Sequence, residues 1–554
     1  MRPTVSVKHV PVLILLSLVC AAVNLTKPVH IDDSGHVDLA RVALRDPLKV
    51  MTVDVNWGDT LLPVWTYGRP PLLFYLFALV MVVAGESLLA LHGFIAILSA
   101  ASVFLFHAIA NRLVPEKATL LTALLFLGPA FLPGQNLMTD VPLMVLGLTV
   151  FWALLSATPE RHHARYFVGS VAVAAACLVK YTSLALVPTF GLVVLIRRQW
   201  GCLGYLLVPI AALAGWSLFT YHAYGGIHLL HSPYMPLSVL KLFVWIIDWL
   251  AGLGSVAPFS VVFLSTRDAG RFGRYSLLLG LVGGAALYFA SCTDPRVSHA
   301  TGLTWAVFVA NGLFVVGVFL RALWNDAARD WRQGDKLQLE RKIILVVWLL
   351  GSCVFVIFFA PLMAIRHVLL AMPPLLLLLG PTWVRVAKCG WERLALGLTT
   401  FLGIALAVSD YAYADVYRQY AHRIAKELPP GARVWHTGHW GWQWYAERAG
   451  MLQYDTVRTV FRKGDYVVVP SIVAQQEIRP DHARAMTKVR TVIVPGRPLT
   501  WFRTMGDEPW GGYYAFSIHR QGPPWRLSRA PLETFDIYQV TDLAEDRNDP
   551  TVIR

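Results

Sequence analysis

Two adjacent carboxylates near the N-terminus are the residues of this chain best suited to catalysis. Asp32 and Asp33 lie in a polar segment between the first apolar stretch, residues 10–23, and the second, residues 72–83. A carboxylate just beyond a membrane face stays hydrated and ionised, so it can accept the proton of an attacking hydroxyl. The alternative interpretation is structural, because Asp33 or Ser34 could instead cap an amphipathic helix that lies on the membrane.

Further ionisable residues recur beside later apolar stretches. Arg69 lies near the end of the first polar segment, Asp140 precedes an apolar stretch, and Lys180 has apolar residues on both sides. Arg366 and His367 stand directly before another stretch. Ionisable groups are costly at a membrane and often mark functional sites, and several cations on one face would attract a phosphate. The alternatives are an N-cap for Asp140 and membrane-boundary anchors for the long cationic side chains.

The composition places these residues in a membrane protein. Of the 554 residues, 56% are hydrophobic and only 15% are charged, and the mean hydropathy is +0.53; these values exceed those of soluble globular chains. The formal net charge is +14, but Lys and Arg form short clusters between apolar stretches, as the positive-inside rule expects. We therefore expect membrane lipid around the chain and no nucleic-acid partner.

The basic clusters set the predicted orientation. Those expected in the cytoplasm are residues 161–165, 197–198, 267–274, 321–342 and 385–393. About fourteen apolar stretches precede residue 410, but a cytoplasmic N-terminus and an outer C-terminal region require an odd number of crossings. We predict about 13 spans, with one stretch between residues 72 and 131 tilted, re-entrant or merged with its neighbour. Asp32, Asp140, Lys180 and Arg366 then share the extracytoplasmic side.

The chain is predicted to divide into two domains. Residues 1–409 form a multi-span α-helical domain with a long first outer loop at about residues 26–70. Residues 410–554 carry β-branched runs at 466–470 and 491–495 and a helix-compatible stretch at 442–449, which indicates a small extracytoplasmic α/β domain. Its clustered tryptophans form either a sugar-binding platform or part of the core or membrane interface; they are Trp435, Trp440, Trp442 and Trp444.

The spacing of cysteine and histidine gives no sign of a metal site or a disulfide framework. The six cysteines are scattered singly, and residues 410–554 contain none. His222, His228 and His231 share one predicted outer loop, but their spacing matches no standard ligand set. We therefore predict no metal-binding residues.

Five short motifs together resemble those of a known enzyme class. They are residues 32–40, 69–72, 137–143, 180–182 and 366–370. In order and predicted placement they are similar to the motifs of GT-C-type integral membrane glycosyltransferases, the superfamily that includes bacterial relatives of protein O-mannosyltransferases and the lipid A aminoarabinose transferase. The resemblance covers about residues 1–380.

The resemblance implies that a sugar passes from a polyprenyl-phosphate-linked donor to an envelope lipid, glycan or protein. The reaction is expected at the outer face of a bacterial cytoplasmic (inner) membrane. By position, Asp32 matches the family's catalytic carboxylate and Asp33 matches a second acid. The expected substrate-binding residues are Arg69, Asp140, Lys180, Arg366 and His367.

The expected chemistry is direct displacement at the anomeric carbon with inversion. Asp32 takes the proton of the acceptor hydroxyl, and Lys180, Arg69 and Arg366 stabilise the departing phosphate. No cofactor is firmly implied, although a divalent cation is compatible with the class because other GT-C enzymes use one.

The chain departs from the family pattern at two places. His36 stands where relatives often carry an aromatic residue, and Gly68-Arg69 replaces the Glu-Lys of aminoarabinose transferases. The lost carboxylate puts aminoarabinose itself in doubt as the sugar. Asp54 or Asp59 could replace it, although each also fits a solvated loop acid.

The competing class is a polytopic transporter or a lipid-sugar flippase, which would also carry polar residues within a helical bundle. Three features favour the enzyme: the sequence lacks a long internal repeat, its acids and cations fall on one predicted side, and an outer domain follows at one end only.

Overall fold

The computed structural model describes most of the 554-residue chain. The described residues are 7–67, 69–157, 162–231, 238–265, 270–293, 297–386, 389–473, 476–505, 512–516 and 523–541. Two residues named in the sequence analysis lie outside the described residues. They are Gly68, of the Gly68-Arg69 pair, and Arg161, of the predicted basic cluster 161–165.

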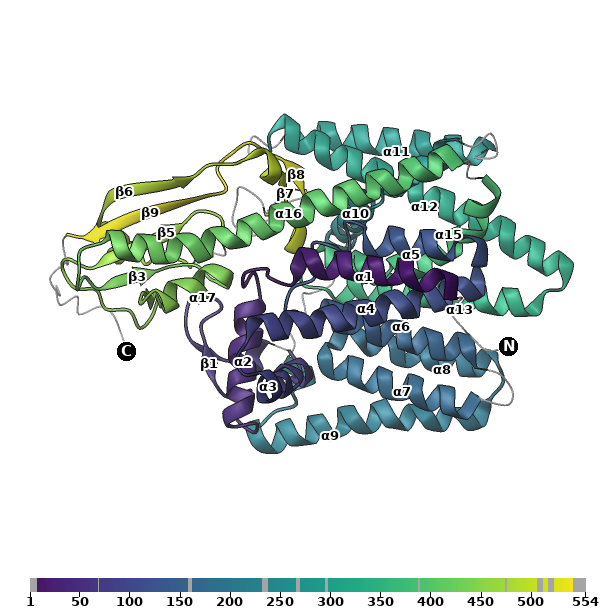
Figure 1. Cartoon of the computed structure of the whole chain (residues 1–554), viewed down its shortest axis with the longest axis horizontal. Coiled ribbons are helices and arrows are strands. Elements are labelled where there is room, and N and C mark those ends of the chain that lie inside the picture. Colours follow the sequence, from purple (N-terminus) through teal and green to yellow (C-terminus); the bar gives the residue numbers. More distant parts are fainter. Residues whose placement is uncertain are drawn as a thin grey trace.

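Helices dominate and form a bundle, from which a strand-rich region extends at one end (Figure 1). The helices are α1 (Val10–Asn24), α2 (Asp33–Arg45), α3 (Leu72–Ala84), α4 (Leu88–Leu113), α5 (Ala118–Phe126), α6 (Asp140–Ser156), α7 (His162–Val179), α8 (Leu186–Ile196), α9 (Leu207–Tyr224), α10 (Val239–Val256), α11 (Gly270–Ser291), α12 (His299–Gln333), α13 (Lys336–Phe359), α14 (Ile365–Leu369), α15 (Met372–Val386), α16 (Cys389–Glu427), α17 (Trp440–Arg448) and α18 (Pro480–Arg484). The strands are β1 (Asp54–Val55), β2 (Leu62–Pro63), β3 (Val434–His436), β4 (Leu452–Gln453), β5 (Tyr466–Pro470), β6 (Met486–Val494), β7 (Phe502–Arg503), β8 (Arg526–Leu527) and β9 (Glu533–Val540).

Several helices are long and apolar enough to cross a membrane. Within the described residues there are six such segments: Leu88–Leu113, Trp200–Tyr224, Val239–Val256, His299–Gln333, Lys336–Phe359 and Cys389–Glu427. Five shorter apolar segments accompany them: Val10–Asn24, Leu72–Ala84, Asp140–Ser156, Tyr181–Ile196 and Arg274–Ala290. The chain is therefore a multi-pass membrane protein, as predicted, whereas the count of about 13 spans stays a prediction.

The region between residues 72 and 131, where the sequence indicates an irregular span, contains α3, α4 and α5. At 9 residues, α5 extends only about 14 Å, half the thickness of a hydrocarbon core. Its side chains are mostly buried, including Leu121, Leu124 and Phe126. It therefore packs inside the bundle and is too short to cross a membrane by itself.

The long first loop contains the amphipathic helix α2. Its mean apolarity is low, yet Val37, Ala40 and Ala43 recur at helical spacing and are buried. This face packs against α3, and the helix also contacts α17. In Figure 1, α2 lies at the junction between the bundle and the strand-rich region, so the residues at its N-terminus are held by both.

The strand-rich region is a five-stranded mixed sheet in the order β4-β3-β5-β9-β6. Strand β3 pairs in parallel with β4 and β5, whereas β9 pairs antiparallel with β5 and β6. The predicted strand at 466–470 and the helix near 442–449 are present as β5 and α17. The proposed boundary at residue 409 falls within α16, a continuous helix that runs from the bundle to the sheet (Figure 1).

Hydrogen bonds join the first loop to the sheet. Asn56 donates to the carbonyl of Tyr454 at 3.0 Å, and the Thr60 hydroxyl donates to Asp455 at 3.0 Å. His439 Nε2 lies 2.8 Å from the Gly58 carbonyl. These contacts link residues almost 400 positions apart, so the sheet holds the loop that leads to the candidate site.

Candidate active site

A cavity of about 990 Å³ lies between the first loop and the helices α3, α8, α13 and α14. This volume is at the upper end of the range of about 300–1,000 Å³ for small-molecule sites. The polar side chains of its lining, called the polar end below, include Asp32, His36, Tyr67, Arg69, Thr139, Lys180, Arg366 and His367. Most of the remaining lining is apolar and includes Pro188, Leu192, Leu350, Val354 and Phe355 of α8 and α13.

Asp32 lies at the polar end between two guanidinium groups. Arg69 Nη2 donates to Asp32 Oδ2 at 3.1 Å, and Arg366 Nη1 is 3.7 Å from the same oxygen. The Asp32 side chain is 18% exposed. Burial alone would raise the pKa of its carboxyl group, but Arg69 and Arg366 outweigh burial and lower that pKa to about 2.

Asp32 occupies the N-cap position of α2, but its side chain does not cap the helix. Within the described residues, its carboxylate makes no hydrogen bond to the first N–H groups of α2. Asp140 is the first residue of α6, with Thr139 at the N-cap. The predicted caps, Asp33 or Ser34 for α2 and Asp140 for α6, therefore do not occupy the N-cap positions.

Lys180 and Asp140 form a second, looser pair beside the first. Their Nζ and Oδ1 atoms are 4.0 Å apart, and Lys180 follows the last residue of α7. Burial, together with the charge of Arg366, lowers the pKa of Lys180 to about 8, although Asp140 opposes this shift. The lysine therefore remains mostly protonated at neutral pH.

The polar end carries a surplus of positive charge. Arg69, Arg366 and Lys180 contribute three positive charges, and Asp32 and Asp140 contribute two negative charges, which leaves a net charge of one positive unit. An anion with a single negative charge would neutralise this arrangement.

The two histidines at the cavity are neutral. Burial, assisted by Arg69, lowers the pKa of His36 to about 3, and burial lowers the pKa of His367 well below its usual value. Each imidazole therefore offers one donor and one acceptor to a ligand without adding charge.

Asp33 is placed differently from Asp32. Its side chain is fully buried, and its Oδ2 accepts a hydrogen bond from the His30 N–H at 3.0 Å. Among the described residues, it is not part of the cavity lining. Burial raises its pKa to about 8, so it is largely protonated at neutral pH, and its predicted catalytic role stays a prediction.

The cavity brings together predicted residues from five chain segments: Asp32, Arg69, Lys180, Arg366 and His367 line it, and Asp140 lies beside Lys180. The sequence did not indicate Tyr67 or the apolar wall from α8 and α13. Leucine and valine that face a cavity have the same local pattern as those that face lipid, so no sequence signal separates them.

The loop histidines and the C-terminal tryptophans have separate structural environments. His228 is buried and its Nδ1 lies 2.7 Å from the Tyr181 hydroxyl, whereas the ring of His231 packs at a tilt of 43° against Trp65, with the ring centroids 4.3 Å apart. Trp442 and Trp444 are buried in the interior, which favours the core over an exposed sugar platform.

Comparison with known proteins gives a match to one family over part of the chain. The chain is similar to membrane glycosyltransferases of the GT-C class, as the motifs predict. The particular family whose model matches is dolichyl-phosphate-mannose-protein mannosyltransferase, over residues 68–222. This segment contains Arg69, Asp140 and Lys180 but ends before Arg366 and begins after Asp32.

Two solved structures illustrate the structural likeness. ArnT from Cupriavidus metallidurans bound to undecaprenyl phosphate is 17% identical, with a TM-score of 0.42, over 88% of this chain and 97% of that one. The oligosaccharyltransferase AglB from Archaeoglobus fulgidus, in complex with an inhibitory peptide and a dolichol-phosphate, is 11% identical, with a TM-score of 0.45, over 84% of this chain and 69% of that one. Both TM-scores lie below 0.5, so neither likeness by itself establishes a common fold. No curated protein matches the sequence.

Proposed function

We propose that this protein is a glycosyltransferase that moves a sugar from a polyprenyl-phosphate carrier to an envelope lipid, glycan or protein. The observation that supports this most directly is a single cavity that joins three cations to an apolar wall from α8 and α13. Such a cavity suits a ligand with an anionic head and a long hydrocarbon tail. The match to a mannosyltransferase family over residues 68–222 supports the same class.

The charges of the site suit both the donor and the leaving group. A polyprenyl-phosphate sugar is a phosphodiester with one negative charge, which balances the surplus of one positive charge at the cavity. When the sugar leaves, the phosphate becomes a monoester that carries about 1.5–2 negative charges near neutral pH. Arg69, Arg366 and Lys180 therefore stabilise the departing phosphate more than the bound donor, and this difference lowers the barrier.

The general base is Asp32, and donor binding activates it. With Arg69 and Arg366 beside it, its pKa of about 2 makes the carboxylate a weak base. A donor phosphate competes for the same guanidinium groups, and as they turn to the phosphate the pKa of Asp32 rises toward its ordinary value. The acceptor is thus deprotonated efficiently only after the donor has bound.

The reaction is an inverting displacement. The acceptor oxygen forms a bond to the anomeric carbon, the bond from that carbon to the phosphate oxygen breaks, and Asp32 receives the hydroxyl proton. Polyprenyl phosphate leaves with the electron pair. We place this reaction at the extracytoplasmic face of the cytoplasmic membrane, which the distribution of basic loops supports.

Two measurements test the proposal. Lipids, glycans and envelope proteins from cells with the wild-type protein should contain a species heavier by one sugar residue than in cells with Asp32→Asn, and the fraction that carries it identifies the acceptor. Purified protein in liposomes with an extract of lipid-linked sugars should release polyprenyl phosphate, about 10²- to 10⁴-fold more slowly in Asp32→Asn. Movement of the donor across the bilayer with its sugar–phosphate bond intact would instead establish a flippase.

A further inference from the structure

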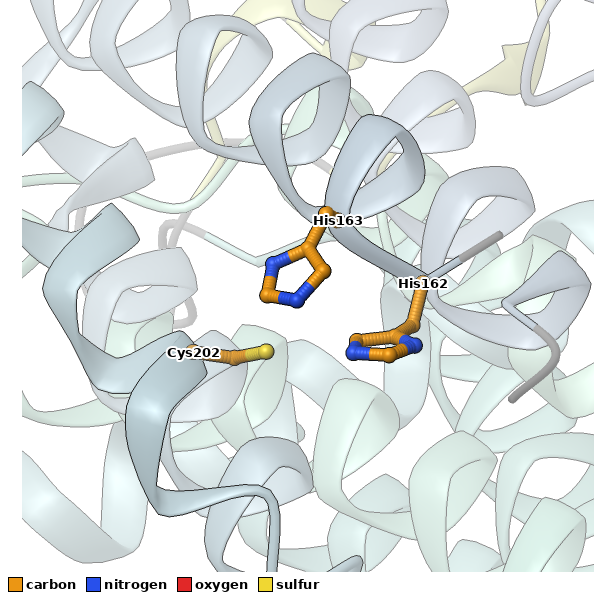
Figure 2. A group of neighbouring side chains, drawn as sticks. All are labelled: His162, His163 and Cys202. Atoms are coloured by element: carbon orange, nitrogen blue, oxygen red, sulfur yellow. The ribbon is translucent and has the colours of Figure 1, made fainter. Parts of the chain in front are cut away.

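Two histidines and a cysteine converge far from the proposed active site. His162 and His163 are the first two residues of α7, and Cys202 lies in the 3₁₀ segment Trp200–Leu206 that precedes α9. One potential ligand atom from each lies within 4.8 Å of the other two. Figure 2 shows the sulfur of Cys202 directed at the space between the two imidazole rings.

The orientation of His163 is already fixed by a hydrogen bond. Its Nδ1 lies 3.1 Å from the hydroxyl of Tyr205, and Figure 2 shows its other ring nitrogen on the side of the Cys202 sulfur. A histidine that ligates a metal commonly uses its second ring nitrogen for such an outer hydrogen bond, which sets the tautomer and the ring plane. Tyr205 thus leaves Nε2 of His163 available to a ligand.

We propose that His162, His163 and Cys202 form a zinc-binding site. Imidazole nitrogen and thiolate sulfur are the ligands that zinc prefers, at about 2.0–2.1 Å and 2.3 Å. Around a tetrahedral ion, these bond lengths place neighbouring ligand atoms about 3.3–3.6 Å apart. Side-chain rotation brings the three atoms together from within 4.8 Å, because His163 is exposed. A water molecule supplies the fourth ligand from that open side.

The basic residues near the site have partners of their own. Arg197 Nε donates to Glu340 Oε1 at 2.7 Å, and the guanidinium of Arg165 lies 4.1 Å from the centre of the Trp152 ring. The charge of Arg197 is therefore balanced by Glu340. The thiolate of Cys202 reduces the charge of the bound ion further, so a divalent cation is tolerated here.

The role of this zinc ion is structural, because it would cross-link the start of α7 to the 3₁₀ segment Trp200–Leu206. His162 and His163 lie at the start of α7, whereas Cys202 follows the end of α8, so the ion would join the ends of both helices. Helix α7 has 18 residues and is about 27 Å long, and Lys180 follows its opposite end. The ion lies too far away to touch the donor, but it would anchor the helix that positions Lys180.

Cobalt binding to the purified full-length protein in detergent tests the site. Co²⁺ replaces zinc in such sites, and a thiolate ligand gives it a charge-transfer absorption band in the near ultraviolet. We expect one Co²⁺ per chain with this band, displaced by Zn²⁺. Cys202→Ser should abolish the band, whereas Cys353→Ser, which changes a cysteine of α13 outside the cluster, should retain it.

Two histidine variants and one tyrosine variant complete the test. His163→Ala should weaken Co²⁺ binding at least about tenfold, and Tyr205→Phe should weaken it about 10- to 100-fold through the lost outer hydrogen bond. His222→Ala, in the last turn of α9, should bind Co²⁺ like the wild type. Zn²⁺ should raise the thermal unfolding midpoint of the wild type but not that of His163→Ala.

The proposal fails if the wild type gives no thiolate-to-cobalt band, or if the band persists in Cys202→Ser. If Cys202→Ser does not fold, His163→Ala decides the matter alone, because an exposed side chain can be truncated without opening the core; unchanged Co²⁺ affinity in that variant overturns the site. None of these readouts depends on glycosyl transfer, so they can fail or succeed independently of the proposed reaction.

Discussion

Replacing Asp32 by asparagine should have opposite effects on donor binding and on transfer. Burial raises the pKa of Asp32, and Arg69 and Arg366 outweigh it and lower that pKa from 3.8 to about 2; this net change corresponds to about 2.5 kcal/mol. A donor phosphate that takes Arg69 and Arg366 must offset their interaction with Asp32 in the wild type. Asp32→Asn removes that competition, so it should bind polyprenyl phosphate more tightly, by a factor on the order of 60, while transfer falls.

The binding assay uses polyprenyl phosphate, the reaction product, because it occupies the phosphate site without turnover. Its dissociation constant can be measured by titration calorimetry on purified wild type and Asp32→Asn at pH 7. Asp38→Asn is the matched control, since Asp38 is a carboxylate of the same helix that pairs with Arg41 at 2.8 Å outside the cavity. Weaker or unchanged binding in Asp32→Asn would refute the exchange of arginines between carboxylate and phosphate.

Three further changes test other parts of the structure. Because Lys180 has a pKa of about 8, it loses its charge as pH rises through 8, so kcat/KM for the donor should fall in that range. Lys180→Arg should extend activity to higher pH, and identical pH profiles of kcat/KM in the wild type and the variant would show that Lys180 does not bind the donor. Asp410→Ala should destabilise the protein by about 3–5 kcal/mol in thermal or denaturant unfolding, because it leaves the buried ammonium group of Lys27, 2.5 Å from the Asp410 carboxylate in the wild type, without its ion-pair partner. Partial recovery of stability on adding Lys27→Met would confirm this cause, and an unaltered unfolding midpoint in Asp410→Ala would contradict it. In a cysteine-free background, Leu48→Cys should react with an impermeant thiol reagent in intact cells and Leu337→Cys only after permeabilisation; the reverse pattern would invert the orientation.

The polar end of the candidate site was predictable because ionisable residues stand out between apolar stretches. Asp32, Arg69, Lys180 and Arg366 come from four separate segments, and the structure gathers them around one cavity. The sequence could not show that Asp32 pairs with both arginines, since their spacing along the chain does not determine distance in space. Nor could it show that Asp33 turns away from the cavity.

Other features depend on contacts that local sequence does not encode. The cavity wall residues Leu192 and Val354 have the same pattern as lipid-facing neighbours. The strand β9, which lies between β5 and β6 in the sheet, begins with Glu533, a charged residue that a strand pattern disfavours. It is accommodated because Tyr417 donates to its carboxylate at 2.7 Å and the Ser471 hydroxyl donates at 2.7 Å.

The sequence did not indicate the proposed zinc-binding cluster for a similar reason. His162 and His163 are separated from Cys202 by almost 40 residues, a spacing outside the usual metal motifs. They meet because α7 and α8 return the chain to one end of the bundle, which a count of cysteine and histidine intervals cannot reveal.

The docking of the first loop on the sheet has a consequence for biosynthesis. Asn56, Gly58 and Thr60 are translated early, but their partners Tyr454, His439 and Asp455 emerge from the ribosome almost 400 residues later. While the helices insert one after another, the first loop therefore has its packing against α3 but none of these hydrogen bonds. A chain released before its sheet is made would contain every helix of the bundle and still lack these contacts, so under the proposed function we expect incomplete copies in the membrane to consume little lipid-linked sugar.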